Sequence, residues 1–399
     1  MGVLDRMRVA LFTDTFLPEI NGVATSTANL AKTLREHGNA VLVVCTNPFD
    51  KELRYEEEEG ILRIPGMELK KIYGYRLTGF YNKTAMRIVR EFAPDIIHIQ
   101  TDVGVGTFGN LAAARLGVGK IYTYHTMIED YAYYITKGHF DRFARHVVRL
   151  FFRGKSTLFD EIIAPSDKSK DYLRSIGIDS PISVIPTGIE LSRFTRSNEN
   201  KAKTATLKKK YGIGPDETVL LSLGRIAEEK SIDVLLRGYA KFLSENPAKK
   251  TKFVITGWGP AEDGLKALAT SLKIDDHVIF TGKSQQDKTQ EFYHMGDIFL
   301  CASLTETQGL TFMEAMAAQL LVLARYDDNL AGTIKDGETG KFFFDENDFP
   351  TKLNEVLSMD PITKENIIEN ALRSVDEYSM ENFYKRIIEV YARVQKKYW

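Results

Sequence analysis

Cysteine, surplus charge and long apolar runs are all scarce in this chain. The 399 residues include two cysteines, Cys45 and Cys301, too few and too far apart in sequence for a disulfide framework or a zinc site. The net charge of −1 offers no overall attraction to nucleic acid or to a membrane. No run approaches the ~18 apolar residues of a membrane span, and the first residues lack the apolar core of a signal peptide. These absences predict a cytoplasmic protein in which any attraction to lipid is local.

Two nucleotide-binding signatures are also missing. No G-x-G-x-x-G follows the first predicted strand, at 8–13, so a dinucleotide-dependent oxidoreductase loses its main support. There is no Walker A pattern either. The composition is otherwise that of an ordinary globular protein, with 43% apolar and 27% charged residues. The length predicts two or three domains.

Short apolar runs alternate with segments of helical period, which is typical of a parallel sheet covered by helices on both faces. In the first half the predicted strands are 8–13, 41–45, 95–100, 120–124 and 161–165. The pattern pauses at 182–188, and a polar stretch at 193–210 is interpreted as a linker and a first helix. The series then restarts with strands at 218–224, 252–257, 277–282, 297–302 and 320–324.

This alternation predicts an α/β fold with two doubly wound Rossmann-like domains, residues 1–190 and 191–377. The last helical segment, 378–399, carries apolar side chains at helical spacing and is expected to pack back on the N-terminal domain. Ligands bind outside the carboxyl ends of the strands in such sheets. The expected site is therefore the cleft between the two domains.

The segment from Glu306 to Glu314 combines two carboxylates with Gly309 between them and a run of helix formers at its end. A helix N-terminus can hold a phosphate on its unpaired amides, while two acids can bind hydroxyl groups. A sugar nucleotide offers that mixture. The alternative is a capping box in which Thr311 and Glu314 satisfy each other's backbone amides. The segment alone does not decide between them.

Glycines and basic residues recur at the predicted strand ends of the second half. Arg225 and Lys230 lie just past a strand and before a helix, where they could neutralise a diphosphate or could form a solvated surface pair. The glycines at or just past strand ends are Gly224, Gly257, Gly259 and Gly282. Such glycines allow sharp turns or close approach to a ligand, and their recurrence favours a nucleotide pocket.

The first half offers two further candidates. Gly22 opens the first helix, where its backbone could meet a phosphate. His125 ends a predicted strand and is expected to face the cleft, although a lone histidine is often structural.

Residues 139–155 place basic side chains on one face of a predicted helix and aromatic and aliphatic ones on the opposite face. An interfacial helix on anionic lipid and a surface helix with solvated arginines are both compatible with this pattern. The basic, aromatic loop at 65–83 could be a second membrane contact or a wall of an acceptor site. The candidate lipid contacts are Arg142, Arg145, Arg149 and Arg153.

Taken together, these motifs resemble those of the retaining GT-B glycosyltransferases, which include glycogen synthase-like and phosphatidylinositol mannosyltransferase-like enzymes. The motifs are, in order, the loop at Gly22, His125, Gly-Arg-x4-Lys at 224–230, Gly-Trp-Gly-Pro at 257–260, and Glu306 with Glu314. The resemblance implies a nucleotide-sugar donor and no metal, because basic residues and helix dipoles stabilise the leaving group. It also implies that the donor phosphate helps to deprotonate the acceptor.

The resemblance assigns a role to each candidate residue. Arg225 and Lys230 would bind the diphosphate and stabilise the leaving nucleotide, and Glu314 would hold the ribose hydroxyls. Glu306 and His125 would contact the transferred sugar. The backbone groups implied in donor binding belong to Gly22, Gly257, Gly309 and Leu310.

A closer resemblance is to the bacterial diacylglycerol glucosyltransferases, carried by segments 124–131, 306–310 and 325–329. It implies an enzyme on the inner face of the cell membrane that moves a hexose, expected to be glucose, from a UDP-sugar to diacylglycerol. No cofactor and no nucleic-acid partner are expected, and anionic lipid would be a binding surface. Two alternatives stay open: a soluble glycosyltransferase with another acceptor, and a non-catalytic nucleotide-sugar-binding protein. Gln319-Leu-Leu departs from the family's usual Gly-x-Pro turn, which leaves the following loop in doubt.

Overall fold

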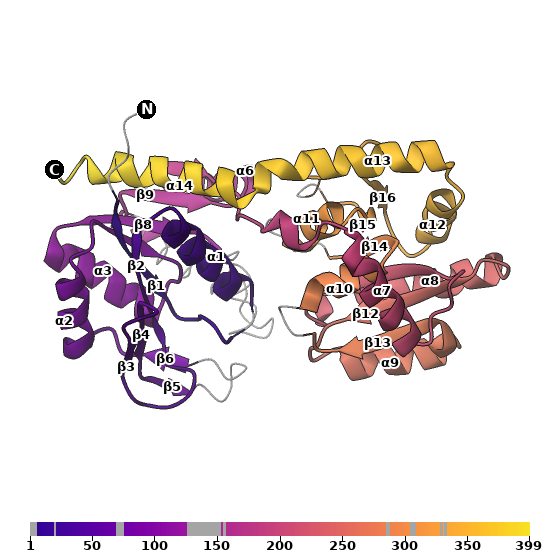
Figure 1. Cartoon of the computed structure of the whole chain (residues 1–399), viewed down its shortest axis with the longest axis horizontal. Helices are drawn as coiled ribbons and strands as arrows, with labels where there is room; N and C mark the ends of the chain where they lie inside the picture. Colours follow the sequence, from indigo (N-terminus) through magenta and orange to yellow (C-terminus); the bar gives the residue numbers. More distant parts are fainter. Residues whose placement is uncertain are drawn as a thin grey trace. The chain divides into compact units, whose positions relative to one another are not determined.

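The computed structural model describes residues 6–19, 21–68, 76–125, 153–154, 157–284, 288–303, 309–327, 330 and 333–399. The chain forms two compact units (Figure 1). Unit 1 comprises Met1–Gly188 and Met380–Trp399, and unit 2 comprises Ile189–Ser379. Each is built on one mainly parallel sheet, which confirms the predicted fold class of two Rossmann-like domains.

The sheet of unit 1 has the strand order β10-β9-β8-β7-β1-β2-β4-β3. Its pairs are parallel except for β3 with β4. The strands are β1 (Arg8–Thr13), β2 (Ala40–Thr46), β3 (Arg54–Glu56), β4 (Ile61–Ile64), β7 (Ile96–Ile99), β8 (Gly119–Thr123), β9 (Glu161–Ala164) and β10 (Ile182–Val184). A separate antiparallel pair consists of β5 (Gly66–Glu68) and β6 (Arg76–Thr78).

Helices cover both faces of this sheet. The described helices of unit 1 are α1 (Gly22–Glu36), α2 (Lys83–Phe92), α3 (Gly104–Leu116), α6 (Asp167–Ser175) and α14 (Met380–Gln395). Because strand side chains alternate between faces, Val9 and Leu11 pack with α1 and α14, whereas Ala10 and Phe12 pack with α2, α3 and α6. Asn side chains at the N-cap positions, Asn21 and Asn82, accept hydrogen bonds from the first turns of α1 and α2.

The C-terminal helix α14 is tied to unit 1 by polar as well as apolar contacts. Arg393 donates two hydrogen bonds to the buried carboxylate of Glu161, at 3.0 and 2.5 Å. Tyr398, just past α14, donates to Asp160 at 2.8 Å. A Cβ at Gly119 would lie 2.5 Å from Val394, so the helix rests directly on the start of β8. Two strands of unit 1 are therefore held by the end of the chain.

The sheet of unit 2 has the order β13-β12-β11-β14-β15-β16 and is parallel throughout. Its strands are β11 (Thr218–Leu223), β12 (Thr251–Thr256), β13 (Val278–Gly282), β14 (Ile298–Cys301), β15 (Leu321–Arg325) and β16 (Lys341–Phe343). The described helices are α7 (Asn198–Lys210), α8 (Ile232–Glu245), α9 (Glu262–Ser271), α10 (Thr289–Met295), α11 (Leu310–Ala317), α12 (Phe349–Leu357) and α13 (Pro361–Ser374), with short 3₁₀ turns η1 (Leu191–Arg193), η2 (Glu228–Lys230), η3 (Asp275–His277) and η5 (Val375–Tyr378).

The strand order of each sheet reverses beside its first strand. Consecutive strands run outward from β1 on one side and from β7 on the other, and likewise from β11 and β14. Such a switch point leaves room for a ligand beyond the carboxyl ends of the central strands. The residues that follow β1, β7 and β8 in unit 1, and β11, β12 and β14 in unit 2, are therefore well placed for function.

Two features differ from the sequence-based expectations. The pause predicted at 182–188 is wrong in its first part, because Ile182–Val184 form β10, an edge strand parallel to β9. Three-residue strands such as β3 and β16 were not predicted, because an apolar period cannot be recognised over so few residues. No helix in the described part of the chain is long and apolar enough to cross a membrane.

Candidate active site

Two loops at the carboxyl edge of unit 2 interlock through glycine backbone. Gly224 follows β11 with φ +151°, and Gly257 follows β12 with φ +147°. A Cβ at Gly257 would lie 1.8 Å from the carbonyl oxygen of Gly224, and one at Gly259 would lie 2.1 Å from that of Ile226. Only glycine permits this approach. We call residues 224–226 and 257–259 the glycine cradle.

Backbone hydrogen bonds close the glycine cradle. Gly224 N donates to Thr256 O at 3.0 Å, and Ile226 N donates to Trp258 O at 3.1 Å. Gly257 N donates to Gly282 O at 3.1 Å, which ties in the end of β13. The glycines singled out from the sequence thus lie together, and they shape a backbone surface that does not depend on side chains.

Arg225 and Lys230 flank this surface. Arg225 is exposed and forms an ion pair with Glu229 one helical turn later, while Lys230 ends η2 and is partly buried. Both cations lie just past β11, as the sequence predicted, and their roles toward a diphosphate stay predictions. Binding of an anion by Arg225 would compete with its contact to Glu229.

Glu314 lies on α11 and is held by a tyrosine. Tyr293 donates a hydrogen bond to its carboxylate at 2.7 Å. Burial raises the pKa of Glu314 to about 7, although the bond from Tyr293 and the charge of Arg193 lower it. The capping-box alternative is wrong, because Gly309, with φ +71°, is the N-cap residue of α11 and Thr311 lies inside the helix.

The N-terminus of α11 carries no side-chain cap among the described residues. Its first amides, beginning at Leu310, are therefore suited to an anionic or hydroxyl ligand, as predicted for Gly309 and Leu310. Glu306 lies outside the described residues, so its predicted contact with the sugar stays a prediction.

In unit 1, His125 follows β8 and is held by a buried amide. Its Nε2 lies 2.7 Å from Oε1 of Gln100, which follows β7. Burial lowers the pKa of His125 to about 4, so the ring is neutral at pH 7. A neutral imidazole can exchange a hydrogen bond with a sugar hydroxyl, but it does not supply positive charge.

The sequence analysis missed two polar residues behind His125. His98 on β7 is fully buried between Tyr391 Oη, 2.7 Å from Nδ1, and Thr123 Oγ1, 2.6 Å from Nε2. Burial, together with the neighbouring His125, lowers the pKa of His98 to about 3. The available signal was a pair of polar residues, His98 and Gln100, at alternate positions of an otherwise apolar strand.

Gly22 is exposed at the N-terminus of α1, and a Cβ there would meet nothing within 4 Å. Packing within the described part of unit 1 therefore does not require glycine at this position, which leaves its predicted phosphate contact open. Asn21 next to it accepts a hydrogen bond from Ala24 N at 2.9 Å, which fixes the start of the helix.

The predicted lipid contacts fall mostly outside the described residues, namely Arg142, Arg145 and Arg149. Arg153 is described and exposed, and its guanidinium lies beside Gly177, just past α6. Among the residues that the structure describes, no three His, Cys, Asp or Glu side chains gather in a way that could hold a metal ion.

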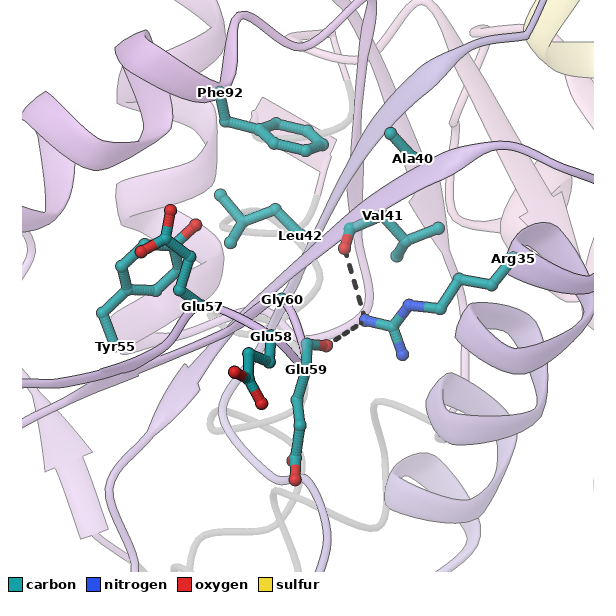
Figure 2. Close-up of a pocket in the computed structure, with 10 residues that line it drawn as sticks. All are labelled: Arg35, Ala40, Val41, Leu42, Tyr55, Glu57, Glu58, Glu59, Gly60 and Phe92. Carbon is teal, nitrogen blue, oxygen red and sulfur yellow. Dashed lines mark hydrogen bonds between the residues drawn. The ribbon is translucent and has the colours of Figure 1, made fainter.

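A surface hollow of about 200 Å³ lies elsewhere on unit 1 (Figure 2). Arg35 crosses one side and donates hydrogen bonds to the carbonyls of Val41 and Glu59, at 3.3 and 2.8 Å. The turn at 57–60 contributes Glu57, Glu58, Glu59 and Gly60 to its lining. Because Ala40 begins β2 whereas His125 follows the end of β8, the hollow lies at the opposite edge of the sheet from His125 and does not belong to this site.

Comparisons with known proteins agree with this geometry. Residues 20–193 match the model of Glycosyltransferase Family 4, and residues 203–374 match that of Glycosyl transferases group 1. An alpha-monoglucosyldiacylglycerol synthase of Streptococcus pneumoniae is 37% identical over 96% of this chain and 85% of its own. A synthase of the same name from Acholeplasma laidlawii is 32% identical over 96% of both chains. HepE from Anabaena, solved with UDP and glucose, aligns over 97% of this chain and 100% of its own with a TM-score of 0.72 and 16% identity, which supports the fold.

Proposed function

The chain belongs to the GT-B glycosyltransferases, and from this premise we propose that it moves glucose from UDP-glucose to the free hydroxyl of diacylglycerol. The observation that carries the proposal is the glycine cradle with Arg225 and Lys230 beside it, in a chain related to alpha-monoglucosyldiacylglycerol synthases. UDP-glucose holds its leaving group in the α configuration. An α-glucoside product therefore corresponds to retention.

On the donor side, Arg225 and Lys230 would stabilise the negative charge that develops on the leaving diphosphate. Breaking the bond between the sugar C1 and the diphosphate places negative charge on UDP. Arg225 can present a planar pair of donors and Lys230 a compact charge, and both stabilise the departing diphosphate most when the bond has broken. The acceptor oxygen then bonds to C1 on the same face, and its proton passes to the departing phosphate. Glu314 would accept hydrogen bonds from the ribose hydroxyls.

On the acceptor side, exposed apolar side chains favour a lipid as the acceptor. Phe49 follows β2 with 54% of its surface exposed, and Met67 follows β4 with 71% exposed. Leu17 follows β1 and Val103 follows β7, and both are exposed as well. All four lie beyond the carboxyl ends of strands in unit 1, the same edge as His125. Exposed apolar side chains at this edge suit acyl chains better than a polysaccharide.

We also propose that the enzyme works at the inner membrane surface without a metal. Arg142, Arg145, Arg149 and Arg153 would attract anionic lipid. The cations at Arg225 and Lys230 would take the place of a metal at the diphosphate. Activity should therefore rise with anionic phospholipid and should not change when EDTA is added.

The decisive experiment is transfer of labelled glucose from UDP-glucose to diacylglycerol in mixed micelles, with UDP-galactose and GDP-mannose as competing donors. Lipid-extractable label from UDP-glucose alone is the expected result. Hydrolysis of the donor without labelled lipid would reject the acceptor. Turnover of no donor would reject the enzyme in favour of a nucleotide-sugar-binding protein.

Matched variants separate lipid recognition from donor chemistry. Met67→Ser and Phe49→Ser should each lower the use of diacylglycerol by about tenfold, because each removes apolar area that an acyl chain would cover, and should leave donor hydrolysis unchanged. Ile362→Ser is the control, since Ile362 is 73% exposed, about as much as Met67, but lies on α13 in unit 2. Equal effects of all three changes would contradict the proposed acceptor surface.

A further inference from the structure

Polar side chains from β7, β8, α14 and the residues after the two strands form two neighbouring hydrogen-bonded groups in unit 1, Gln100 with His125 and His98 with Thr123 and Tyr391. We propose that Gln100 and His98 are positioning residues that hold the His125 ring in one orientation and one tautomer, and that α14 completes this support through Tyr391. The inference rests on the proposed function for the role of His125 toward the sugar. It goes further by adding three residues that do not touch the substrate.

Sheet geometry places these residues on one face. β7 and β8 are adjacent and parallel, with His98 opposite Ile121. Because side chains alternate along a strand, His98 and Gln100 point to the same side as Thr123 and His125. That is the side covered by α1 and α14, since Ile96 and Ile121 pack there against both helices. This interface between the sheet and the two helices thus places two polar groups next to each other among apolar side chains: His98 with Thr123, and Gln100 with His125.

The side-chain amide of Gln100 is hydrogen bonded to His125. Its Oε1 can only accept, so the bond of 2.7 Å requires the proton of His125 to be on Nε2. Gln100 is 3% exposed, and its Nε2 has no hydrogen-bond partner in the described structure. A buried amide is costly unless it is hydrogen bonded. The one side-chain hydrogen bond that Gln100 makes in the described structure is to His125. With the proton on Nε2, Nδ1 of His125 is left as an acceptor.

His98 extends this support to the end of the chain. Both of its ring nitrogens are used, one by Thr123 and one by Tyr391. The Tyr391 ring meets the imidazole edge to face, with centroids 5.7 Å apart and planes at 88°. Thr123 is two residues before His125 on the same strand. Tyr391 is fully buried, so the position of α14 is transmitted to the strand that carries His125.

Charge considerations agree with this geometry. Burial lowers the pKa of both histidines, to about 3 for His98 and about 4 for His125. Two neutral imidazoles can lie near each other here without repulsion, and the Oε1 acceptor of Gln100 selects the Nε2–H form of His125. A ring oriented in this way offers a sugar hydroxyl an acceptor at a fixed place, and orientation of that kind contributes to rate.

The test begins with the imidazole ring itself. The protein is labelled with ¹⁵N-histidine, and the resonances of His125, one of seven histidines, are assigned by comparison with His125→Gln. The wild type should show the Nε2–H tautomer. Gln100→Leu removes the acceptor and should give a mixture of tautomers. Gln100→Glu keeps an acceptor in place and should restore Nε2–H.

Kinetics provide the second readout. Gln100→Leu should lower kcat by roughly 10- to 100-fold with little change in KM for UDP-glucose, because orientation is lost while donor binding is kept. Tyr391→Phe should lower kcat about 3- to 10-fold by freeing His98. Tyr239→Phe is the matched control, because its buried hydroxyl bonds to Thr251 in unit 2 and its loss should leave kcat unchanged.

The outcomes keep the two proposals apart. An unchanged His125 tautomer in Gln100→Leu overturns this inference, whatever sugar the enzyme transfers. An equal loss of kcat in Tyr391→Phe and Tyr239→Phe also overturns the part assigned to α14. If the tautomer responds as expected but the wild type does not transfer glucose to diacylglycerol, the proposed function fails and the positioning of His125 stands.

Discussion

In unit 2, backbone hydrogen bonds and close glycine contacts hold the loops after β11 and β12 in place. In unit 1, hydrogen bonds between side chains hold the polar residues at the ends of β7 and β8. In unit 2, glycines bring two loops within a distance that any Cβ would forbid, and cations lie beside them. In unit 1, two neighbouring groups of side chains are hydrogen bonded within themselves: Gln100 with His125, and His98 with Thr123 and Tyr391. The first arrangement suits a charged diphosphate, and the second suits hydroxyl groups.

This difference has a physical reason. Charge stabilisation tolerates some freedom in the cation, because Coulomb energy varies slowly with distance, but it needs a backbone that a phosphate can approach closely. A hydrogen bond to a hydroxyl group depends steeply on direction. His125 therefore needs several neighbours to hold it, while Lys230 needs only to lie near the diphosphate. Four changes, all in unit 2, test that side of the comparison.

Loss of the cation should have the largest effect. Lys230→Ala should lower kcat by about 10²–10³, the usual result of removing one group that stabilises charge in the transition state. Single-turnover transfer of labelled glucose measures it. Lys250→Ala is the control, since Lys250 is exposed just before β12, at the opposite edge of the same sheet. Near-normal turnover in Lys230→Ala would show that unit 2 does not act through charge.

Filling the glycine cradle should have the next largest effect. Gly257→Ala should lower the free energy of unfolding of unit 2 by about 3 kcal/mol, because the new Cβ would strain the backbone and strike the carbonyl of Gly224. Urea denaturation measures the change. Gly264→Ala on α9 has open space around it and should instead raise stability by about 0.5–1 kcal/mol. Similar values for both would contradict the interlocking of the loops.

The carboxyl group of Glu314 predicts a dependence on pH. Its pKa is about 7 in the folded protein, above its ordinary value of 4.5. Between these values the folded state holds a proton that the unfolded state has lost, so stability falls as pH rises from about 4.5 through 7. Glu314→Gln removes this pH dependence. Between pH 5 and pH 8 its free energy of unfolding should rise by about 2 kcal/mol relative to that of the wild type. Parallel stability curves for the two proteins would contradict the burial of this group.

The turn after α11 predicts the smallest effect. Gln319 has φ +59°, a conformation that costs a side-chain-bearing residue about 1 kcal/mol. Gln319→Gly should raise the free energy of unfolding by about 0.5–1 kcal/mol, and Gln319→Ala should give no such gain. Thermal unfolding of the three proteins compares them. A gain with alanine instead of glycine would mean that the backbone at this turn is not strained.

Gln319 is also the position at which the chain departs from the family pattern. Glycine is the usual residue at this turn in the family that the chain resembles, and the turn still adopts a left-handed conformation here. The turn leads directly into β15, which begins at Leu321.

Most of the fold could be predicted from local pattern. The long central strands of both sheets begin and end within a residue or two of the predicted bounds, because buried parallel strands appear as continuous apolar runs. Edge elements such as β3, β10 and β16 were missed, because three residues carry no recognisable period. The capping-box alternative could not be rejected from spacing, because the start of α11 depends on the conformation of Gly309.

In the candidate site, too, some residues could be predicted from local sequence and others could not. The glycines of the cradle, with Arg225 and Lys230, are separated by short, regular distances from strand ends, so local sequence was enough to place them beyond the sheet. His98 and Tyr391 are 293 residues apart, and Gln100 is 25 residues from His125. Contacts of that kind require the strands to be adjacent in the sheet and α14 to return to unit 1. The sequence analysis predicted that 378–399 packs on the N-terminal domain, but no local pattern identifies which side chains meet there.

The central parallel strands of both sheets, the glycine turns at the edge of unit 2 and the cations beside them could be predicted from sequence, because each depends on residues close together in the chain. Which polar groups meet in the interior of unit 1, such as Gln100 with His125 and His98 with Tyr391, follows only from the tertiary structure. A hydrogen bond forms only between groups that folding has already brought within about 3 Å. The identity of such partners is a property of the packed sheet and its covering helices.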